Sequence, residues 1–332
     1  MPLLPLAARK WTILTSTNVT EFDTTPSEAP VPSFADLGLS EEVLSAVADM
    51  GYIAPTPVQA ASIPHALDGE DVLAAAQTGT GKTAAFLLPT MNNLPHVPRS
   101  RARGRVAAQG PLMLVITPTR ELAQQIEEVC RAIARRTGHT SVTVVGGVSY
   151  NPQRDKLKRG CDILIATPGR LQDLIDQGAC SLDQVQVLVL DEADRMLDMG
   201  FSEDIMKIVS YMPKERQTIM FSATLPPKIR EMARTILRNP AEVNIAISKP
   251  NEAIDQSAYV CYENQKLGII REMFAEPTDS KTIIFSSSKL KVKELAHTLK
   301  RMKLDVAPMH SDLDQEKREQ VMLDFKNNKG FS

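Results

Sequence analysis

Short apolar runs alternate with helix-like stretches between residues 71 and 246. Apolar side chains fill almost every position of each run, as is typical of strands that are buried on both faces of a sheet. The runs cover residues 71–75, 112–116, 142–145, 163–166, 187–190 and 218–221. Between them, apolar residues recur with helical spacing, for example over residues 120–135 and 201–211. The pattern predicts an α/β fold, a doubly wound parallel sheet whose two faces are covered by helices.

The N-terminal residues 1–33 show neither of these periods. Thr, Ser, Pro and Glu cluster there, and such a composition is typical of a disordered tail. Order is expected to begin near Phe34, and Ser40 is placed to cap the helix that follows it. We therefore predict a disordered tail over residues 1–33 and a first domain over residues 34–246.

The alternation restarts after an aperiodic stretch, residues 247–256, which indicates a linker. Residues 257–332 are then predicted to form a second domain. Its expected strands and helices are residues 258–262, 282–285 and 305–308, and residues 289–302 and 315–327, respectively. Three strands are few for a doubly wound sheet, so we expect this second domain to be incomplete.

A glycine-containing loop joins the first apolar run to a helix-like stretch and has the sequence of a phosphate loop. Its members are Ala76, Gln77, Thr78, Gly79, Thr80, Gly81, Lys82 and Thr83. Glycines let backbone N–H groups turn toward phosphate oxygens, and the start of the following helix adds partial positive charge. Lys82 is placed to reach the β- and γ-phosphates of a nucleotide, and the Thr83 hydroxyl is placed to hold Mg²⁺. Ala76 stands where the general pattern of such loops has its first glycine.

Two carboxylates follow the apolar run at residues 187–190. Asp191 is placed to hold Mg²⁺, directly or through water, and Glu192 is placed to orient and deprotonate an attacking water. Acidic residues at this position could also simply favour the start of the next helix. The phosphate loop upstream favours the catalytic interpretation, because functional loops of parallel sheets gather at the carboxyl ends of the strands.

Composition narrows the choice of partners and location. The chain has 332 residues, 43% of them hydrophobic and 23% charged, which is ordinary for a soluble globular protein of two domains. Its net charge of −2 is not the basic footprint of a nucleic-acid binder, so such a partner must be argued from particular sites. The four cysteines are far apart, no apolar run is long enough to span a membrane, and the N-terminus lacks the charged start of a signal peptide. We therefore expect a cytoplasmic protein without a membrane partner.

Several motifs, in a fixed order, resemble those of the DEAD-box RNA helicases of superfamily 2. Asp191-Glu192-Ala193-Asp194 resembles the motif that gives the family its name, and residues 76–83 match the family's A-x-T-G-x-G-K-T. Residues 51–59 resemble the adenine-reading Q motif, with Phe34 as the isolated aromatic upstream. Ser222-Ala223-Thr224 resembles the motif that couples hydrolysis to unwinding. The RNA-contact motifs are matched by Pro118, Thr119 and Arg120, by Gly146 and Gly147, and by Thr167, Pro168, Gly169 and Arg170.

The resemblance covers residues 34 to about 240, and the branch that it most suggests is the RhlE-like bacterial one. It implies an ATP- and Mg²⁺-dependent RNA helicase with a RecA-like first domain and an incomplete second RecA-like domain. Gln59 would pair with adenine through its amide, and Phe34 would either stack on the base or belong to the core. The RNA-contact motifs would hold phosphates and sugars, so RNA binding would be independent of base sequence. Ser222 and Thr224 would couple hydrolysis to duplex opening.

The second half resembles the family only in part. Residues 283–289 resemble motif IV, and Gln315 with Arg318 resembles the Q-x-x-R element after it, whereas Ser311 stands where the family has glycine. The family's T-D-x-x-x-R-G-x-D and H-R-x-G-R-x-x-R motifs would follow Ser332. Since the second of these supplies the arginine finger, we expect a C-terminally truncated chain with impaired hydrolysis.

Two other interpretations of the sequence stay open. The chain could be an ATP- and RNA-binding module without helicase activity, or a DNA-directed translocase of superfamily 2, although the Q motif and the D-E-A-D spelling favour RNA. The loop that contains Arg99, Arg101, Arg103 and Arg105 is either a solvated surface loop or a phosphate contact.

Overall fold

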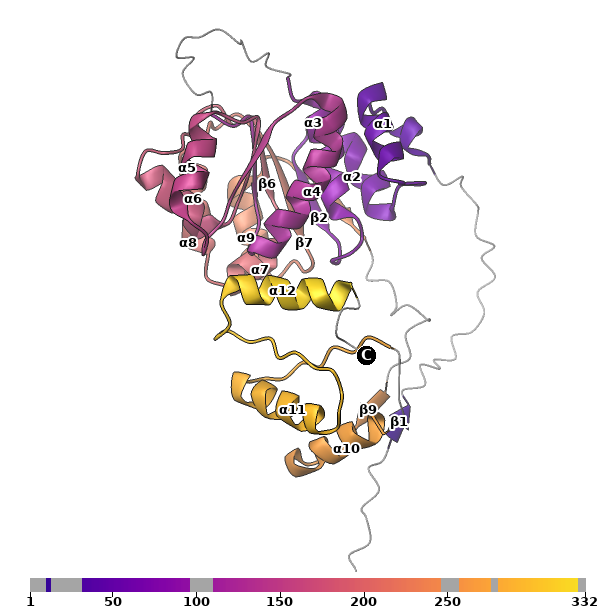
Figure 1. Ribbon diagram of the computed structural model, residues 1–332. Coiled ribbons are helices and arrows are strands. Elements are labelled where there is room, and N and C mark those ends of the chain that lie inside the picture. Colours follow the sequence, from indigo (N-terminus) through magenta and orange to yellow (C-terminus); the bar gives the residue numbers. More distant parts are fainter. Residues whose placement is uncertain (1–9, 13–31, 96–109, 246–256, 276–279, 328–332) are drawn as a thin grey trace, which may run out of the picture. The chain divides into compact units, whose positions relative to one another are not determined.

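The computed structural model describes residues 10–12, 32–95, 110–245, 257–275 and 280–327 (Figure 1). The chain divides into two compact units, one formed by Thr24–Lys249 and the other by Met1–Asp23 together with Pro250–Ser332. The linker expected at residues 247–256 and the arginine-rich loop at residues 99–105 lie outside the described residues. Among the helices of the described ranges, none has the length and apolar character needed to cross a membrane.

The Thr24–Lys249 unit is built on a seven-stranded parallel sheet with the strand order β4-β5-β3-β6-β7-β2-β8. The strands are β2 (Val72–Ala75), β3 (Met113–Ile116), β4 (Ser141–Val144), β5 (Ile163–Ala166), β6 (Val187–Leu190), β7 (Gln217–Ser222) and β8 (Ala241–Asn244). All six apolar runs form strands, so the predicted α/β fold is confirmed. The sequence pattern does not reveal β8, because Val243 is its one buried residue, as suits a strand at the edge of a sheet.

Helices cover both faces of this sheet (Figure 1). The core on one face takes in the short 3₁₀ helix Phe34–Leu37, α1 (Glu41–Asp49), α2 (Pro57–Leu67), α3 (Lys82–Asn93) and α4 (Arg120–Thr137). The core on the other face takes in α5 (Tyr150–Lys158), α6 (Pro168–Asp176), α7 (Ala193–Asp198), α8 (Ser202–Ser210) and α9 (Pro227–Ile236). Within β2, Val72 and Ala74 belong to the first core and Leu73 to the second, since successive side chains of a strand point to opposite faces. The loops at the strand ends are therefore attached to a sheet that is packed against helices on both faces.

The second unit contains a pair of antiparallel strands, β1 (Lys10–Thr12) and β9 (Ser257–Tyr259). Within the tail predicted over residues 1–33, the structure describes Lys10–Thr12 as a strand, and residues 1–9 and 13–31 lie outside the described residues. Local composition could not reveal this strand, because its partner lies almost 250 residues later in the chain. The unit continues with the 3₁₀ helix Glu263–Gln265, α10 (Lys266–Met273), α11 (Lys289–Arg301) and α12 (Gln315–Lys326). The last two match the helices expected from the sequence.

Two segments that we predicted as strands in this unit, residues 282–285 and 305–308, are not strands in the structure. Neither segment has a ladder partner in the described part of the chain, and Phe285 is 92% exposed. Both segments line a largely apolar cavity of about 360 Å³ with α11 and α12. A strand needs a neighbour for its backbone hydrogen bonds, so an apolar sequence alone does not make one.

Candidate active site and nucleic-acid interface

Three neighbouring strands bring the predicted ATP residues to one edge of the sheet. β7 lies between β2 and β6, with Ala75 beside Ser222 and Leu190 beside Met220. Because all strands run the same way, the phosphate loop after β2, Asp191 after β6 and Ser222 at the end of β7 share this edge.

The phosphate loop has the backbone geometry of a cradle. Gly79 and Gly81 have φ angles of 84° and 89°, in the left-handed region that glycine adopts without strain, so the chain can fold back before α3. Gly81 is also the N-cap of α3 and offers no side chain to the first N–H groups of the helix. These N–H groups and the partial positive charge of the helix start are therefore available to an anion.

Hydrogen bonds fix the rest of the loop. The Thr80 hydroxyl donates to the Gln77 carbonyl over 2.7 Å, and the Ala76 N–H donates to the Ser222 carbonyl over 3.0 Å. Thr78 lies at the exposed tip between these two ties. The loop is thus anchored to β7 at its start and closed across itself before Gly81.

Lys82 is the buried cation of the site. Its side chain is 6% exposed, and its Nζ lies 4.0 Å from Asp191 Oδ1 but donates no hydrogen bond to any described residue. A buried ammonium without such bonds is costly, and a phosphate oxygen would supply them. Thr83, the next residue of α3, is half-buried and carries the hydroxyl predicted to hold Mg²⁺. Lys82, Thr83 and Asp191 together fit a nucleotide phosphate with its Mg²⁺.

Asp191 is a carboxyl group in an environment that disfavours its charge. Burial raises the pKa of Asp191 to about 6, although the nearby Lys82 acts in the opposite direction. One carboxylate oxygen, Oδ1, accepts a hydrogen bond from the Glu192 N–H over 3.0 Å. A divalent cation would stabilise the ionised form, and an aspartate oxygen is a ligand that Mg²⁺ prefers.

Glu192 has an uncommon backbone conformation for a residue with a side chain. Its φ and ψ are 54° and 52°, and it is the N-cap of α7. Its carboxylate is buried, and Oε2 accepts a hydrogen bond from Arg195 Nη1 over 3.2 Å. The other oxygen, Oε1, has no hydrogen-bond partner within the described ranges. One carboxylate oxygen is thus held and the other is available to a water.

Asp194 joins the end of β7 to α7, a role that the sequence analysis did not assign to it. Its Oδ2 accepts hydrogen bonds from both the N–H and the hydroxyl of Thr224, each over 2.9 Å. Its N–H donates to the Ser222 hydroxyl over 3.2 Å, and that hydroxyl donates to the Thr224 carbonyl over 2.6 Å. Burial raises the pKa of Asp194, but the hydrogen bonds from Thr224 and its neighbours outweigh burial and leave the pKa below its usual value. Its place as the last residue of the D-E-A-D motif could have indicated this role from the sequence.

The side chains predicted to contact adenine already have partners within the protein. Gln59 is buried; its Oε1 accepts from the Thr56 N–H over 2.9 Å and its Nε2 donates to the Gly81 carbonyl over 3.0 Å. Phe34 is 5% exposed and belongs to the core, with its ring stacked on that of Tyr52 at 6.5 Å between centroids. Of the two interpretations of Phe34, the geometry therefore favours the core residue. Tyr52, which is 37% exposed, is the aromatic ring that stands at the surface next to it.

The predicted RNA-contact residues gather on the other strands of the same edge. β3, β5 and β4 are neighbours, and each is followed by one of the three motifs. Thr119 caps α4 by accepting from the Leu122 N–H, directly after the buried Pro118. Arg120 Nη1 donates to the Gly146 carbonyl over 3.1 Å. Gly147, with a φ of 74°, lies so close to this guanidinium that a Cβ atom there would overlap it.

The third motif is tied to the second one. The Gly146 N–H donates to the Thr167 hydroxyl over 3.4 Å, and Pro168 opens α6 with Gly169 open to solvent behind it. Arg170 Nη1 donates to the Val148 carbonyl over 3.1 Å, and its guanidinium lies over the Tyr150 ring at 5.6 Å. The three loops therefore form one hydrogen-bonded surface.

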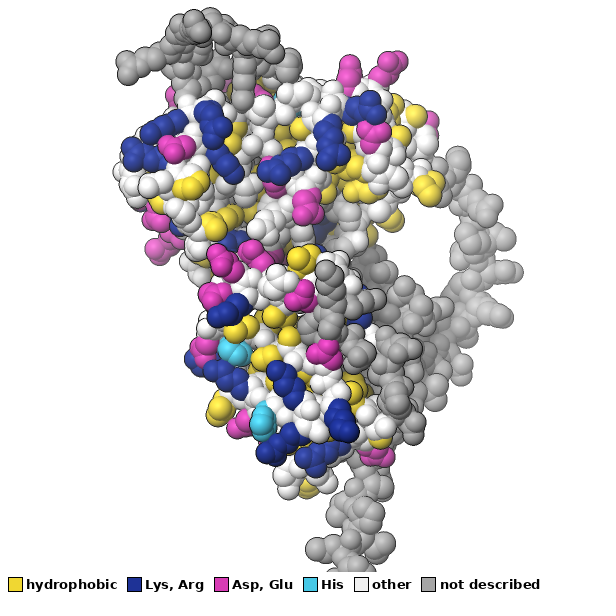
Figure 2. Space-filling view, in the orientation of Figure 1, with side chains coloured by type: hydrophobic (Ala, Val, Ile, Leu, Met, Phe, Trp, Pro, Cys, Tyr) yellow, Lys and Arg dark blue, Asp and Glu magenta, His cyan; other side chains and the backbone are white. Residues whose placement is uncertain are grey.

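Basic side chains flank this surface. α5, which follows the Gly146–Gly147 turn, carries exposed cationic residues, and Lys and Arg gather over it in the space-filling view (Figure 2). These residues are Arg154, Lys156, Lys158 and, just after the helix, Arg159. A chain with a net negative charge thus has local positive charge beside the predicted RNA loops.

Comparison with known protein families identifies the family of this chain. The family model described as DEAD/DEAH box helicase matches residues 56–232, which is more than half of the chain. The chain belongs to the DEAD/DEAH box helicase family. The model described as helicase conserved C-terminal domain matches residues 265–331, so a part of the second helicase domain is present as well.

Other DEAD-box proteins resemble this helicase-family chain over 90% of its length. The chain is 41% identical to the DEAD-box ATP-dependent RNA helicase RhpA of Helicobacter pylori, and 40% identical to the DEAD-box ATP-dependent RNA helicase 14 of Arabidopsis thaliana. It spans 58% and 48% of these two relatives. The crystal structure of a DEAD box protein from the hyperthermophile Methanococcus jannaschii is similar with a TM-score of 0.58 and 31% identity, over 90% of this chain and 78% of that one.

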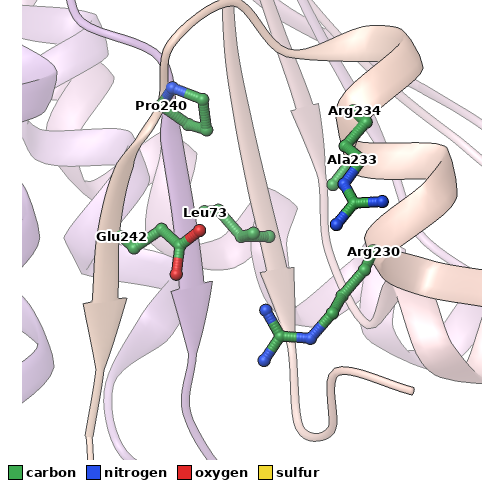
Figure 3. A pocket seen from close by; sticks show the side chains of 6 residues that line it. All are labelled: Leu73, Arg230, Ala233, Arg234, Pro240 and Glu242. Atoms are coloured by element: carbon green, nitrogen blue, oxygen red, sulfur yellow. The ribbon is translucent and has the colours of Figure 1, made fainter. Parts of the chain in front are cut away.

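A separate pocket of this DEAD-box chain lies away from the predicted sites. α9, β2 and the start of β8 enclose about 150 Å³ (Figure 3). The lining residues are Leu73, Arg230, Ala233, Arg234, Pro240 and Glu242. Leu73 is the second residue of β2 and Pro240 precedes β8, so the pocket does not lie at the carboxyl ends of the strands. None of the residues predicted to bind ATP or RNA lines it.

Proposed function

We propose that this chain acts as an ATP- and Mg²⁺-dependent RNA helicase, in which RNA-stimulated hydrolysis of ATP drives local opening of RNA duplexes or remodelling of RNA–protein complexes. The observation that carries the proposal is the buried Lys82 ammonium, which faces Asp191 without a hydrogen-bond partner in the described residues, beside a carboxylate with one available oxygen on Glu192. Family membership makes phosphoryl transfer the natural chemistry of such a constellation.

In this proposal the residues divide the work of hydrolysis. Lys82 and the N–H groups that open α3 hold the β- and γ-phosphates, while Thr83 and Asp191 hold Mg²⁺, which neutralises phosphate charge when it is bound. Glu192 Oε1 accepts the proton of the attacking water. Gln59 keeps the phosphate loop in place and uses its remaining N–H and lone pair for adenine.

The link between hydrolysis and RNA is proposed to run through the end of β7. Asp194, which follows the catalytic carboxylates in the chain, is hydrogen-bonded to Ser222 and Thr224. In this proposal, loss of the γ-phosphate therefore changes the position of the end of β7. The loops at Pro118–Arg120, Gly146–Gly147 and Thr167–Arg170 would bind the phosphates and sugars of RNA, because they present backbone groups and cations and not groups aimed at base edges. Binding would therefore be independent of the base sequence.

The finer assignments are part of the same proposal. We place the chain in the RhlE-like bacterial branch on the motif spellings, and we propose a cytoplasmic location because the cytoplasm is the compartment of a bacterium that contains both ATP and RNA. The relatives that it matches are considerably longer, so the activity of the whole protein is inferred from them.

Phosphate release with and without RNA tests the proposal. The chain is expected to hydrolyse ATP slowly, because none of its residues matches the family's arginine finger, but still faster with single-stranded RNA than with DNA of the same sequence. Glu192→Gln should bind ATP but not release phosphate, because an amide cannot take the proton of water. Stimulation by DNA alone would indicate a DNA-directed translocase. ATP and RNA binding without any turnover would indicate a binding module.

A further inference from the structure

The short helix α7 carries a cation close to the buried carboxylate of Glu192. Arg195 lies three residues after the N-cap Glu192 and belongs to the last turn of this six-residue helix. Its side chain is 54% exposed, yet its Nη1 reaches back to the Glu192 carboxylate, which is 8% exposed. The last turn of a helix is favourable for a cation, but it does not require the guanidinium to turn back toward Glu192. The contact with the buried carboxylate is therefore the feature to explain.

We propose that Arg195 is a positioning residue for the catalytic base. It holds Glu192 Oε2, so that Oε1 faces the attacking water in one orientation. This inference rests on the proposed function, in which Glu192 is the base. A base whose orientation is set by a third group is a recurring arrangement in hydrolytic sites, because a fixed geometry avoids the cost of ordering the base in the transition state.

The backbone of Arg195 connects the base to the element at the end of β7. The Arg195 N–H donates to Asp194 Oδ1 over 3.0 Å, while Asp194 Oδ2 accepts the two hydrogen bonds from Thr224. One residue therefore contacts the base through its guanidinium and Asp194 through its main chain. Movement at Thr224 would reach Glu192 by this route.

The simpler alternative is an ordinary surface ion pair of two residues three apart on a helix. Such pairs join two mobile, solvated side chains and contribute little to stability. Here only the arginine is solvated, and the carboxylate is buried on a residue with a φ of 54°. That backbone conformation restricts where the carboxylate can point, and Arg195 selects among the remaining rotamers.

Three variants of the full chain test the inference by steady-state hydrolysis with saturating RNA. Arg195→Ala should lower kcat about tenfold or more, within the range that general-base catalysis contributes, and should leave KM for ATP within about twofold. Arg195→Lys should recover part of kcat, because it restores the cation but not the planar fork. Arg136→Ala removes a matched arginine, paired with Asp49 at 2.7 Å on the surface, and should leave kcat unchanged. A kcat of Arg195→Ala within twofold of the unaltered chain would overturn the inference.

A crystal structure of nucleotide-free Arg195→Ala gives a second readout that needs no turnover. The Glu192 carboxylate is expected to occupy a different rotamer or several, with an unchanged melting temperature of the protein. A carboxylate that stays in place would overturn the inference. If the unaltered chain shows no RNA-stimulated hydrolysis, the proposed function fails, and the crystal structure still decides whether Arg195 positions Glu192.

Discussion

Lys82 and Glu192 are held in states that cost the folded protein free energy. Lys82 is buried without a hydrogen bond from its ammonium to any described residue, and Glu192 adopts a left-handed conformation that costs a non-glycine residue roughly 1–2 kcal/mol. Unsatisfied charge and backbone strain persist in folded proteins mostly at functional sites, because the surrounding structure has to hold them there. Both residues adjoin Asp191, so the costs concentrate at one place on the sheet edge.

Replacing Lys82 should abolish nucleotide binding. Lys82→Ala removes the buried cation that the phosphates require, and Lys82→Arg should be nearly as damaging, since the bulkier guanidinium does not fit the position of an ammonium. Titration with a fluorescent ATP analogue measures the effect. Micromolar affinity in Lys82→Ala would contradict the role assigned to this side chain.

Asp191 should make the stability of the metal-free protein depend on pH. Its pKa of about 6 exceeds the ordinary value of 3.8, so the folded state binds the proton more tightly than the unfolded state does. Its contribution to stability is therefore fully present below about pH 4 and is lost as the pH rises through 6. Asp191→Asn lacks this dependence, so between pH 4 and 7 the free energy of unfolding of the unaltered chain should fall relative to the variant, by on the order of 3 kcal/mol.

Urea unfolding in the presence of EDTA at several pH values measures this difference. A difference between the two proteins that does not change with pH would contradict the prediction. Added Mg²⁺ should favour the unaltered chain at pH 7, because only the carboxylate binds the cation well.

The sequence predicts most residues of the candidate site but not all of their contacts. A motif spelling locates Lys82 and Asp191 because their chemistry depends on residue type and on the end of a strand. It says nothing about Arg195, since that role depends on the rotamer of a neighbouring side chain. Phe34 could not be assigned either, because a single aromatic residue in a sequence is equally suited to a core and to a base.

At the scale of secondary-structure elements, the amide of Gln59 joins the start of α2 to the start of α3. It accepts from the N-cap Thr56 and donates to the Gly81 carbonyl, so the helix cap and the phosphate loop share one side chain. A Cβ atom on Gly81 would lie 2.5 Å from Gln59 Nε2. The loop can therefore close on α2 only with glycine at this position.

Gly81→Ala should destabilise the nucleotide-free protein more than Gly79→Ala does. Both residues have a positive φ, so each substitution carries a backbone cost of roughly 1–2 kcal/mol. Only the substitution at Gly81 also displaces Gln59, because a Cβ atom at Gly79 would meet nothing within 4 Å. Chemical unfolding of the two variants measures the comparison, and equal losses would show that the Gln59 contact contributes nothing.

The sequence predicted correctly those strands that combine an apolar composition with a partner strand to pair with. Five of the six runs are buried on both faces of the sheet and stand out by apolar content. The edge strand β4 still has two buried valines, whereas the edge strand β8 has only Val243 buried. Residues 282–285 have the same apolar character as the true strands, but they form no ladder. Hydrophobic pattern predicts burial, and pairing depends on residues elsewhere in the chain.

At the scale of the molecule, the predicted ATP and RNA residues all belong to one unit, Thr24–Lys249. This unit contains the complete seven-stranded sheet and both of its cores. The other unit carries the residues that match the helicase C-terminal model. Binding and turnover can therefore be separated by cutting the chain between the units.

A fragment of residues 24–249 should fold and bind ATP–Mg²⁺ with an affinity within about threefold of that of the full chain, because it keeps every proposed phosphate and Mg²⁺ contact. It should show no stimulation by RNA, because members of this family close two domains around ATP. Isothermal titration and phosphate release measured on both proteins provide the test. Full RNA stimulation of the fragment would show that the second unit is dispensable.

The β3–β6 ladder is where the two halves of the sheet edge meet. β4, β5 and β3 carry the predicted RNA loops, β6, β7 and β2 carry the predicted hydrolytic groups, and a single pair of strands joins the two sets. The predicted RNA loops can therefore be exchanged without changing the predicted hydrolytic groups. Grafting the three loops of a relative onto β3, β4 and β5 should transplant the nucleic-acid preference of that relative while basal ATP turnover stays that of the recipient, as competition between RNA and DNA activators would measure.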